Sequence, residues 1–146
     1  MKVKRIVRVR TYKKYEAGLR EIIPAYLAKS LCTDTVQDIL TQFRFGCHTP
    51  CSFGCVVLDD DDVVTGFCYA YLIMDAKGKR LMVDHLHAKN ATMAGKLYDM
   101  LTDKMGVADV WFMTYRDPAS WERLSRKFKK PMKVYGYIMR SESKEG

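Results

Sequence analysis

One stretch in the second half of the chain constrains the fold most, because a helix pattern lies between two strand patterns. Residues 81–87 are typical of a strand, the helix that follows can be capped by Asn90 or Thr92, and residues 110–113 are apolar like a strand inside a sheet. A strand, a helix and a second strand in this order pair in parallel through a right-handed crossover. We therefore expect these two strands to be parallel neighbours.

Before this unit, a run of four aspartates marks a turn between two strands. The chain is apolar on both sides of residues 59–62, from Cys55 to Ile73, and four adjacent carboxylates repel one another too strongly to lie within a strand. A further turn is predicted at residues 77–79. With the strand at 81–87, these segments predict three consecutive antiparallel strands, so the whole sheet is expected to be mixed.

The N-terminal part predicts a strand followed by a helix. Residues 3–10, in which valines alternate with arginines, are typical of a half-buried strand. Apolar residues then recur at spacings of three and four from Tyr15 to Leu31, as in an amphipathic helix. Pro24 either kinks this helix or starts a new one.

Two further helices carry capping signals. Residues 36–43 have a helical pattern and follow Thr33 and Thr35, either of which can accept hydrogen bonds from the first turn. Near the C-terminus, the Asp-Pro pair at 117–118 predicts a helix start, with a cap residue followed by proline in the first turn. A last strand is predicted over 132–139.

The composition indicates one globular domain. With 146 residues, of which 48% are hydrophobic, the chain can bury one core, and we assign residues 1–146 to a single domain. No apolar stretch approaches the ~18–20 residues that cross a bilayer, so no membrane association is expected. Five cysteines, an odd number, suit reduced thiols and a cytoplasmic protein. The net charge of +8 favours an anionic partner such as nucleic acid, a phosphorylated cofactor or an acidic protein.

Element order and local pattern resemble the GNAT superfamily of acyl-coenzyme A dependent N-acyltransferases. The hairpin V-V-L-D-D-D-D-V-V-T-G-F-C-Y-A (56–70) is similar to the family's second and third strands. Residues 81–101 resemble its fourth strand and third helix, and residues 110–128 its fifth strand and fourth helix. The resemblance implies an α/β fold with a mixed, mostly antiparallel central sheet and helices on both faces. It also implies transfer of an acyl group, such as acetyl, from acyl-coenzyme A to a small-molecule or protein amine.

The resemblance also implies a cofactor loop before the third helix. The family pattern Q/R-x-x-G-x-G/A aligns with Lys89-x-x-Thr92-x-Ala94, so that Thr92 stands where the family has a glycine. Backbone N–H groups of such a loop and of the helix N-terminus hold the cofactor pyrophosphate. The implied cofactor-binding residues are Lys89, Asn90, Ala91, Thr92, Met93, Ala94 and Gly95.

Catalytic candidates lie on the fourth strand and the fourth helix. The family's acidic tyrosine aligns with Ser125, whose hydroxyl is shorter and less acidic. Asp84, His85 and His87 are candidate bases, and alternation along a strand places the two histidines on one side. A histidine that titrates near ~6.5 can take a proton from an ammonium group directly or through water.

Two other patterns have competing interpretations. Cys47, Cys51 and Cys55 have spacings that could hold a soft metal, but the segment also contains Pro50 and Gly54, and small buried residues entering a strand are the favoured interpretation. No metal is therefore expected. A basic cluster, either a solvated helix face or a phosphate-binding surface, comprises Arg116, Arg123, Arg126, Lys127, Lys129, Lys130 and Lys133.

The alternative function is a catalytically inactive GNAT-fold protein, of the kind found among virion and accessory proteins of tailed phages. Thr92 and Ser125 both depart from the enzyme pattern, and a fold does not dictate a function. On this hypothesis the basic cluster binds nucleic acid or an acidic protein.

Overall fold

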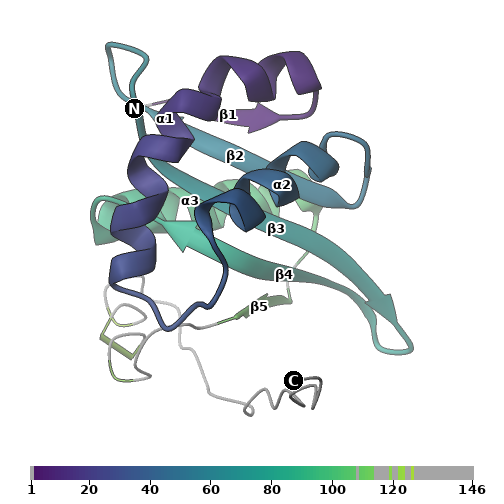
Figure 1. Cartoon of the computed structure of the whole chain (residues 1–146). Helices are drawn as coiled ribbons and strands as arrows, with labels where there is room; N and C mark the ends of the chain where they lie inside the picture. The colour runs from purple at the N-terminus through teal and green to yellow at the C-terminus, as the bar shows by residue number, and fades with distance from the viewer. Residues whose placement is uncertain (1, 108, 114–118, 120–121, 124–125, 127–146) are drawn as a thin grey trace, which may run out of the picture.

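In the part of the chain that the structure describes, a five-stranded sheet is covered by helices on both faces (Figure 1). The computed structural model describes residues 2–107 and 109–113 and the single positions 119, 122, 123 and 126. The elements are β1 (Lys2–Ile6), α1 (Val9–Ala28), α2 (Val36–Gly46), β2 (Ser52–Leu58), β3 (Val64–Asp75), β4 (Gly78–His87), α3 (Ala91–Met105) and β5 (Val110–Phe112). None of the described helices is long and apolar enough to cross a membrane.

The strands lie in the order β1-β2-β3-β4-β5. Strands β1 to β4 pair with one another in antiparallel fashion, whereas β5 is parallel to β4, with Leu81 opposite Val110 and Val83 opposite Phe112. The helix α3 makes the connection between the two parallel strands. The predicted mixed sheet and its parallel pair are therefore confirmed.

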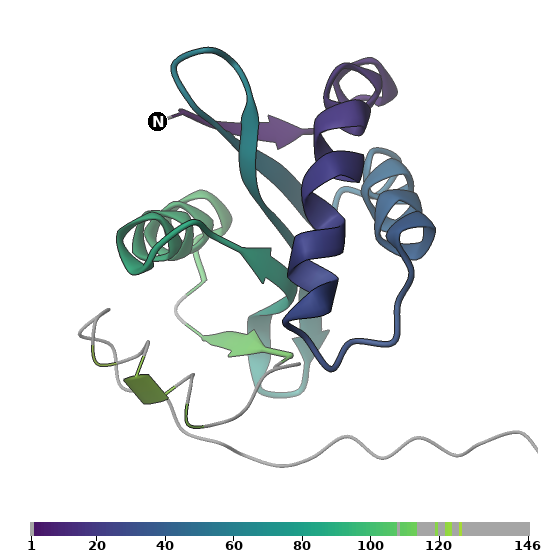
Figure 2. The same ribbon diagram turned by 60° about the vertical axis from the view of Figure 1, so that its left-hand side comes forward.

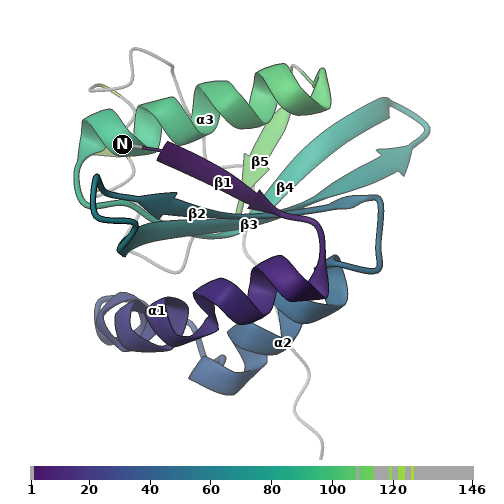
Figure 3. The same ribbon diagram turned by 90° about the horizontal axis from the view of Figure 1, so that it is seen from above.

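Each face of the sheet has its own core. Helices α1 and α2 cover one face and α3 covers the other (Figures 2 and 3). Leu19, Ile23 and Phe43 pack with Phe67 of β3 on the first face, and Leu97 and Leu101 pack against the second. The predicted α/β fold with helices on both faces is confirmed.

Local signals placed several element ends correctly. Thr35 caps α2 through a capping box, in which its Oγ1 accepts from the Asp38 N–H at 3.1 Å and the Asp38 carboxylate accepts from the Thr35 N–H at 2.8 Å. Asn90 caps α3, and Gly106 ends it in the left-handed conformation with φ 61°. The four aspartates form the turn between β2 and β3.

The N-terminal prediction was wrong in its boundary. Strand β1 ends at Ile6 and α1 begins at Val9, so the last two residues of the predicted strand 3–10 are helical and the two before them link the elements. Ile6 pairs with Gly54 and β2 begins two residues away, at Ser52, so β2 offers no partner for Val9 and Arg10. Helix α1 continues through Pro24 as one element.

Candidate functional site

Strand β4 carries the centre of the candidate site because its pairing with β3 is irregular. His85 lies opposite Tyr69 and Val83 opposite Ala70, so Asp84 is an extra residue in the ladder, a β-bulge. Strict alternation would place Asp84 and His85 on opposite faces of the sheet. With the bulge, both side chains lie on the α1/α2 face, and their Oδ2 and Nε2 atoms are 3.6 Å apart.

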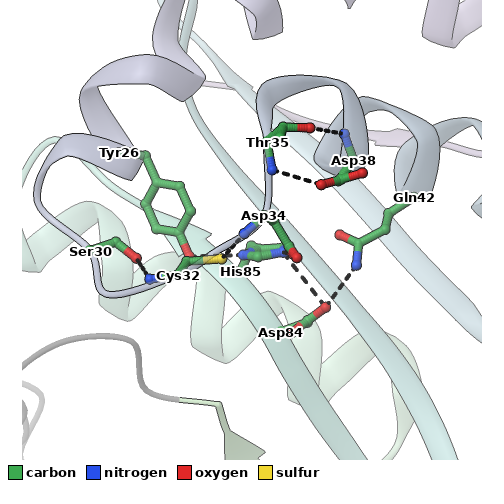
Figure 4. Close-up of polar contacts among 9 residues, drawn as sticks. All are labelled: Tyr26, Ser30, Cys32, Asp34, Thr35, Asp38, Gln42, Asp84 and His85. Atoms are coloured by element: carbon green, nitrogen blue, oxygen red, sulfur yellow. Dashed lines mark hydrogen bonds and ion pairs between the residues drawn. The ribbon is translucent and has the colours of Figure 1, made fainter. Parts of the chain in front are cut away.

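The imidazole of His85 is enclosed between α1, β4 and the loop that joins α1 to α2 (Figure 4). The residue is 1% exposed. Its Nδ1 shares a hydrogen bond of 2.9 Å with the hydroxyl of Tyr26, which is near the end of α1. Its Nε2 lies 3.2 Å from a carboxylate oxygen of Asp34, in the loop. The ring is thus hydrogen-bonded at Nδ1 and lies beside a carboxylate at Nε2.

Two carboxylates, those of Asp34 and Asp84, therefore lie close to Nε2 of His85. Asp34 is part-exposed in the loop, and Asp84 is held from α2 by the side-chain amide of Gln42, whose Nε2 donates to Oδ2 at 3.1 Å. Burial lowers the pKa of His85 below its ordinary value of 6.5, although the Asp84 and Asp34 carboxylates act in the opposite direction. At neutral pH the ring is consequently uncharged and can accept a proton.

The hydroxyl of Tyr26 can form a hydrogen bond with either neutral tautomer of His85. A phenol hydroxyl can donate to an unprotonated Nδ1 or accept from a protonated one. In the first tautomer Nε2 carries the proton, and in the second Nε2 has a lone pair, in each case 3.2 Å from a carboxylate oxygen of Asp34. The contact with Tyr26 is therefore compatible with either state of Nε2.

Hydrogen bonds from backbone N–H groups to side chains within the same segment hold the loop between α1 and α2. The Cys32 N–H donates to the Ser30 hydroxyl at 2.9 Å, and the Asp34 N–H donates to the Cys32 Sγ at 3.4 Å. Burial raises the pKa of the Cys32 thiol, and the Asp34 N–H opposes this rise. The capping box at Thr35 then fixes the point where the chain enters α2.

His87 shares the face of His85, as strand alternation predicts. Its ring packs 5.9 Å from the Tyr26 ring and 5.7 Å from the Phe67 ring, measured between centroids. Of the three predicted bases, His85 and Asp84 come together with Asp34, and His87 lies among aromatic rings. Tyr26, Cys32 and Asp34 were not predicted, because no periodicity or motif links the end of a helix and a loop to a strand some fifty residues later.

The predicted cofactor loop lies at the start of α3. Lys89, Asn90 and Thr92 are exposed, and Ala91 and Gly95 are partly exposed. Met93 and Ala94 are 8% and 3% exposed and pack into the core, so only their backbone can meet a ligand. The Asn90 side chain accepts a hydrogen bond from the Met93 N–H at 2.9 Å. The N–H groups of Ala91 and Thr92, at the first two helical positions, have no acceptor within the helix.

The remaining predicted sites divide into two groups. Cys47, Cys51 and Cys55 do not form a cluster in the part of the chain that the structure describes, since Cys51 is exposed and Cys55 is buried in β2 opposite Cys68. Ser125, the helix predicted after Pro118, the final strand at 132–139 and the basic residues Arg116, Lys127, Lys129, Lys130 and Lys133 lie outside the described residues. Arg123 and Arg126 are described and exposed.

Solved acetyltransferases share this architecture along their whole length. A ribosomal-protein-alanine N-acetyltransferase from Brucella melitensis biovar Abortus 2308 has a TM-score of 0.66 at 13% identity, with 97% of this chain and 100% of that chain covered. An aminoglycoside 6'-N-acetyltransferase from Acinetobacter baumannii has a TM-score of 0.71 at 7% identity, with 97% and 99% covered. AAC(6')-Iy, solved with the bisubstrate analog CoA-S-monomethyl-acetylneamine, has a TM-score of 0.71 at 9% identity, with 97% and 98% covered.

These likenesses define the fold class. No protein-family model matches the sequence, and no curated protein matches it. The chain has the fold of the GNAT acetyltransferases.

Proposed function

We propose that the protein transfers an acyl group from acyl-coenzyme A to a cationic amine. The observation that carries the proposal is the position of His85 Nε2, which lies 3.2 Å from one carboxylate oxygen and 3.6 Å from another. An ammonium group that enters between Asp34 and Asp84 would meet two negative charges and a neutral imidazole. Such surroundings bind the protonated amine and then take its proton.

Residues of this chain have separate roles in the proposed reaction. Asp34 and Asp84 orient the amine, and His85 Nε2 accepts the proton that the amine must lose before its nitrogen can attack. Tyr26 then accepts a hydrogen bond from Nδ1–H and supports the imidazolium that forms. Acyl-coenzyme A supplies the thioester whose carbonyl carbon the amine attacks and whose thiolate leaves. Bringing both reactants together supplies much of the acceleration.

The start of α3 is the proposed site for the pyrophosphate of the coenzyme. The free N–H groups of Ala91 and Thr92 and the positive end of the helix dipole attract an anion there. Lys89 is exposed beside them and adds a positive charge. The Thr92 side chain points away from the core, so its Cβ adds bulk on the solvent side, where a phosphate would approach. The pyrophosphate fits this end of the helix, although less closely than it would with a glycine at position 92.

The first experiment is a thermal-shift measurement with acetyl-coenzyme A, followed by calorimetry. A ligand at about 100 times its dissociation constant stabilises the fold by ~2.7 kcal/mol. No shift at millimolar concentration would refute the proposal.

The second experiment is thiol release with acetyl-coenzyme A and a panel of polyamines, aminoglycosides and peptide N-termini. We expect His85→Asn, which retains a polar atom near the position of Nδ1 but lacks Nε2, to lower kcat about 10²-fold or more. Asp34→Asn should chiefly raise KM for the amine, because it removes a charge that binds the ammonium group. Asp61→Asn, in the exposed turn between β2 and β3, is the matched control and should leave both constants unchanged.

A further inference from the structure

Three side chains of different chemistry converge beside the buried imidazole. The Cys32 Sγ, a carboxylate oxygen of Asp34 and a ring nitrogen of His85 all lie within 4.8 Å of one another. The residues come from a loop and from a strand that is far away in sequence. We propose that this cluster binds a zinc-class divalent metal ion, with Cys32, Asp34 and His85 as its protein ligands.

The spacing is close to that of a tetrahedral site. Zinc bonds of about 2.0–2.3 Å place neighbouring nitrogen and oxygen ligands about 3.4 Å apart, and nitrogen and sulfur about 3.6 Å apart. His85 Nε2 and Asp34 Oδ2 are 3.2 Å apart, near that separation before any adjustment. Because the three ligand atoms lie within 4.8 Å of one another, the thiol has to approach the others by about 1 Å, which rotation of a part-exposed side chain in a loop can provide.

The donor types select the metal. A thiolate and an imidazole favour zinc or cobalt over magnesium or calcium, which prefer an all-oxygen shell. One thiolate and one carboxylate balance the charge of a divalent ion, and binding expels one proton from the thiol to the solvent. The fourth position is open to water or to Asp84, whose Oδ2 lies 3.6 Å from Nε2.

The groups behind the ligands already have the arrangement that a metal site needs. Metal-bound histidines usually form a hydrogen bond through their other ring nitrogen, and Tyr26 occupies that position at 2.9 Å from Nδ1. The Asp34 N–H donates to the Cys32 sulfur, which stabilises a thiolate. Cys32 and Asp34 are both part-exposed, so an ion can enter from the loop side while His85 forms the buried floor.

Metal binding and the proposed proton transfer would use the same lone pair of Nε2. An ion at the cluster would therefore exclude the amine and inhibit acyl transfer. The metal proposal does not depend on that activity, because it concerns the chain without acyl-coenzyme A. The two proposals can accordingly fail separately.

The test is a zinc titration of the full chain after metal removal, in competition with a chromophoric chelator and without acyl-coenzyme A. We expect one equivalent to bind, and cobalt(II) to give a thiolate-to-metal charge-transfer band in the near ultraviolet. Cys32→Ser should abolish that band and weaken zinc binding about tenfold or more. Cys51→Ser, at an exposed cysteine outside the cluster, is the control and should bind like the unmodified chain.

Two outcomes would overturn the proposal. One is the absence of stoichiometric zinc binding by the unmodified chain. The other is a loss of binding in Cys51→Ser as large as in Cys32→Ser, which would assign the metal to other cysteines. Asp34→Asn provides a further variant at a part-exposed position, and far-ultraviolet circular dichroism confirms that each variant is folded.

Discussion

Replacing Tyr26 by phenylalanine removes a single oxygen atom, the hydroxyl that forms a hydrogen bond with His85. That oxygen lies 2.9 Å from Nδ1, and both residues are almost fully buried, with 4% and 1% exposure. The ring contacts of Tyr26 with Phe67 and His85, at centroid distances of 5.2 and 5.6 Å, do not involve the hydroxyl. The substitution therefore tests one hydrogen bond and leaves the packing in place.

The expected cost follows from the environment of the nitrogen that is left behind. A buried polar atom that loses its partner costs about 1–3 kcal/mol, and burial of the phenylalanine ring recovers little of this because the ring is already buried. In a domain of this size each kcal/mol lowers Tm by about 2–4 °C. We expect the free energy of unfolding to fall by about 1–3 kcal/mol, at the same urea m-value.

Urea unfolding of four chains measures the effect: the unmodified protein, Tyr26→Phe, His85→Leu and the double variant. If the hydrogen bond is the cause, Tyr26→Phe costs much less when residue 85 is leucine. Tyr12→Phe, at an equally buried tyrosine of the same helix, is the control and should cost less than Tyr26→Phe. An equal cost of Tyr26→Phe in both backgrounds would refute the reasoning.

Three further predictions concern other parts of the chain. Gly66→Ala should lower the free energy of unfolding by about 1–3 kcal/mol, since the added Cβ would lie 2.7 Å from the backbone oxygen of His87. Urea unfolding measures this, and an unchanged midpoint urea concentration would contradict it. The Thr35 N–H lowers the pKa of Asp38, so this carboxylate stabilises the fold above its unfolded pKa and loses the effect as pH falls through the lower folded value. Thermal unfolding from pH 6 to pH 2 should therefore show a smaller acid-induced loss for Asp38→Asn than for the unmodified chain, and parallel curves would argue against it. Thr92→Gly should tighten acetyl-coenzyme A binding in calorimetry, because it bares the backbone at the start of α3, and equal or weaker binding would refute that role.

Much of the fold follows from signals that act over a few residues. Four adjacent charges require a solvated turn at 59–62, one of the two threonines before residue 36 caps α2, and the helix pattern between two apolar runs leads to a parallel pair. The alternation of a strand likewise placed His85 and His87 on one face. The predicted strand was too long because valines alternating with arginines describe a strand only where a partner strand is present, and β2 provides none for Val9 and Arg10.

The candidate site depended on the tertiary structure. Tyr26 meets His85 across 59 positions of sequence, and Asp34 reaches Nε2 only because the loop between α1 and α2 lies over β4. The β-bulge that turns Asp84 toward the same nitrogen arises from the pairing of β4 with β3. Sequence patterns report the period of one element, whereas the contacts of a site depend on how several elements pack. The residue types were therefore visible in the chain, and packing determined which of them act together.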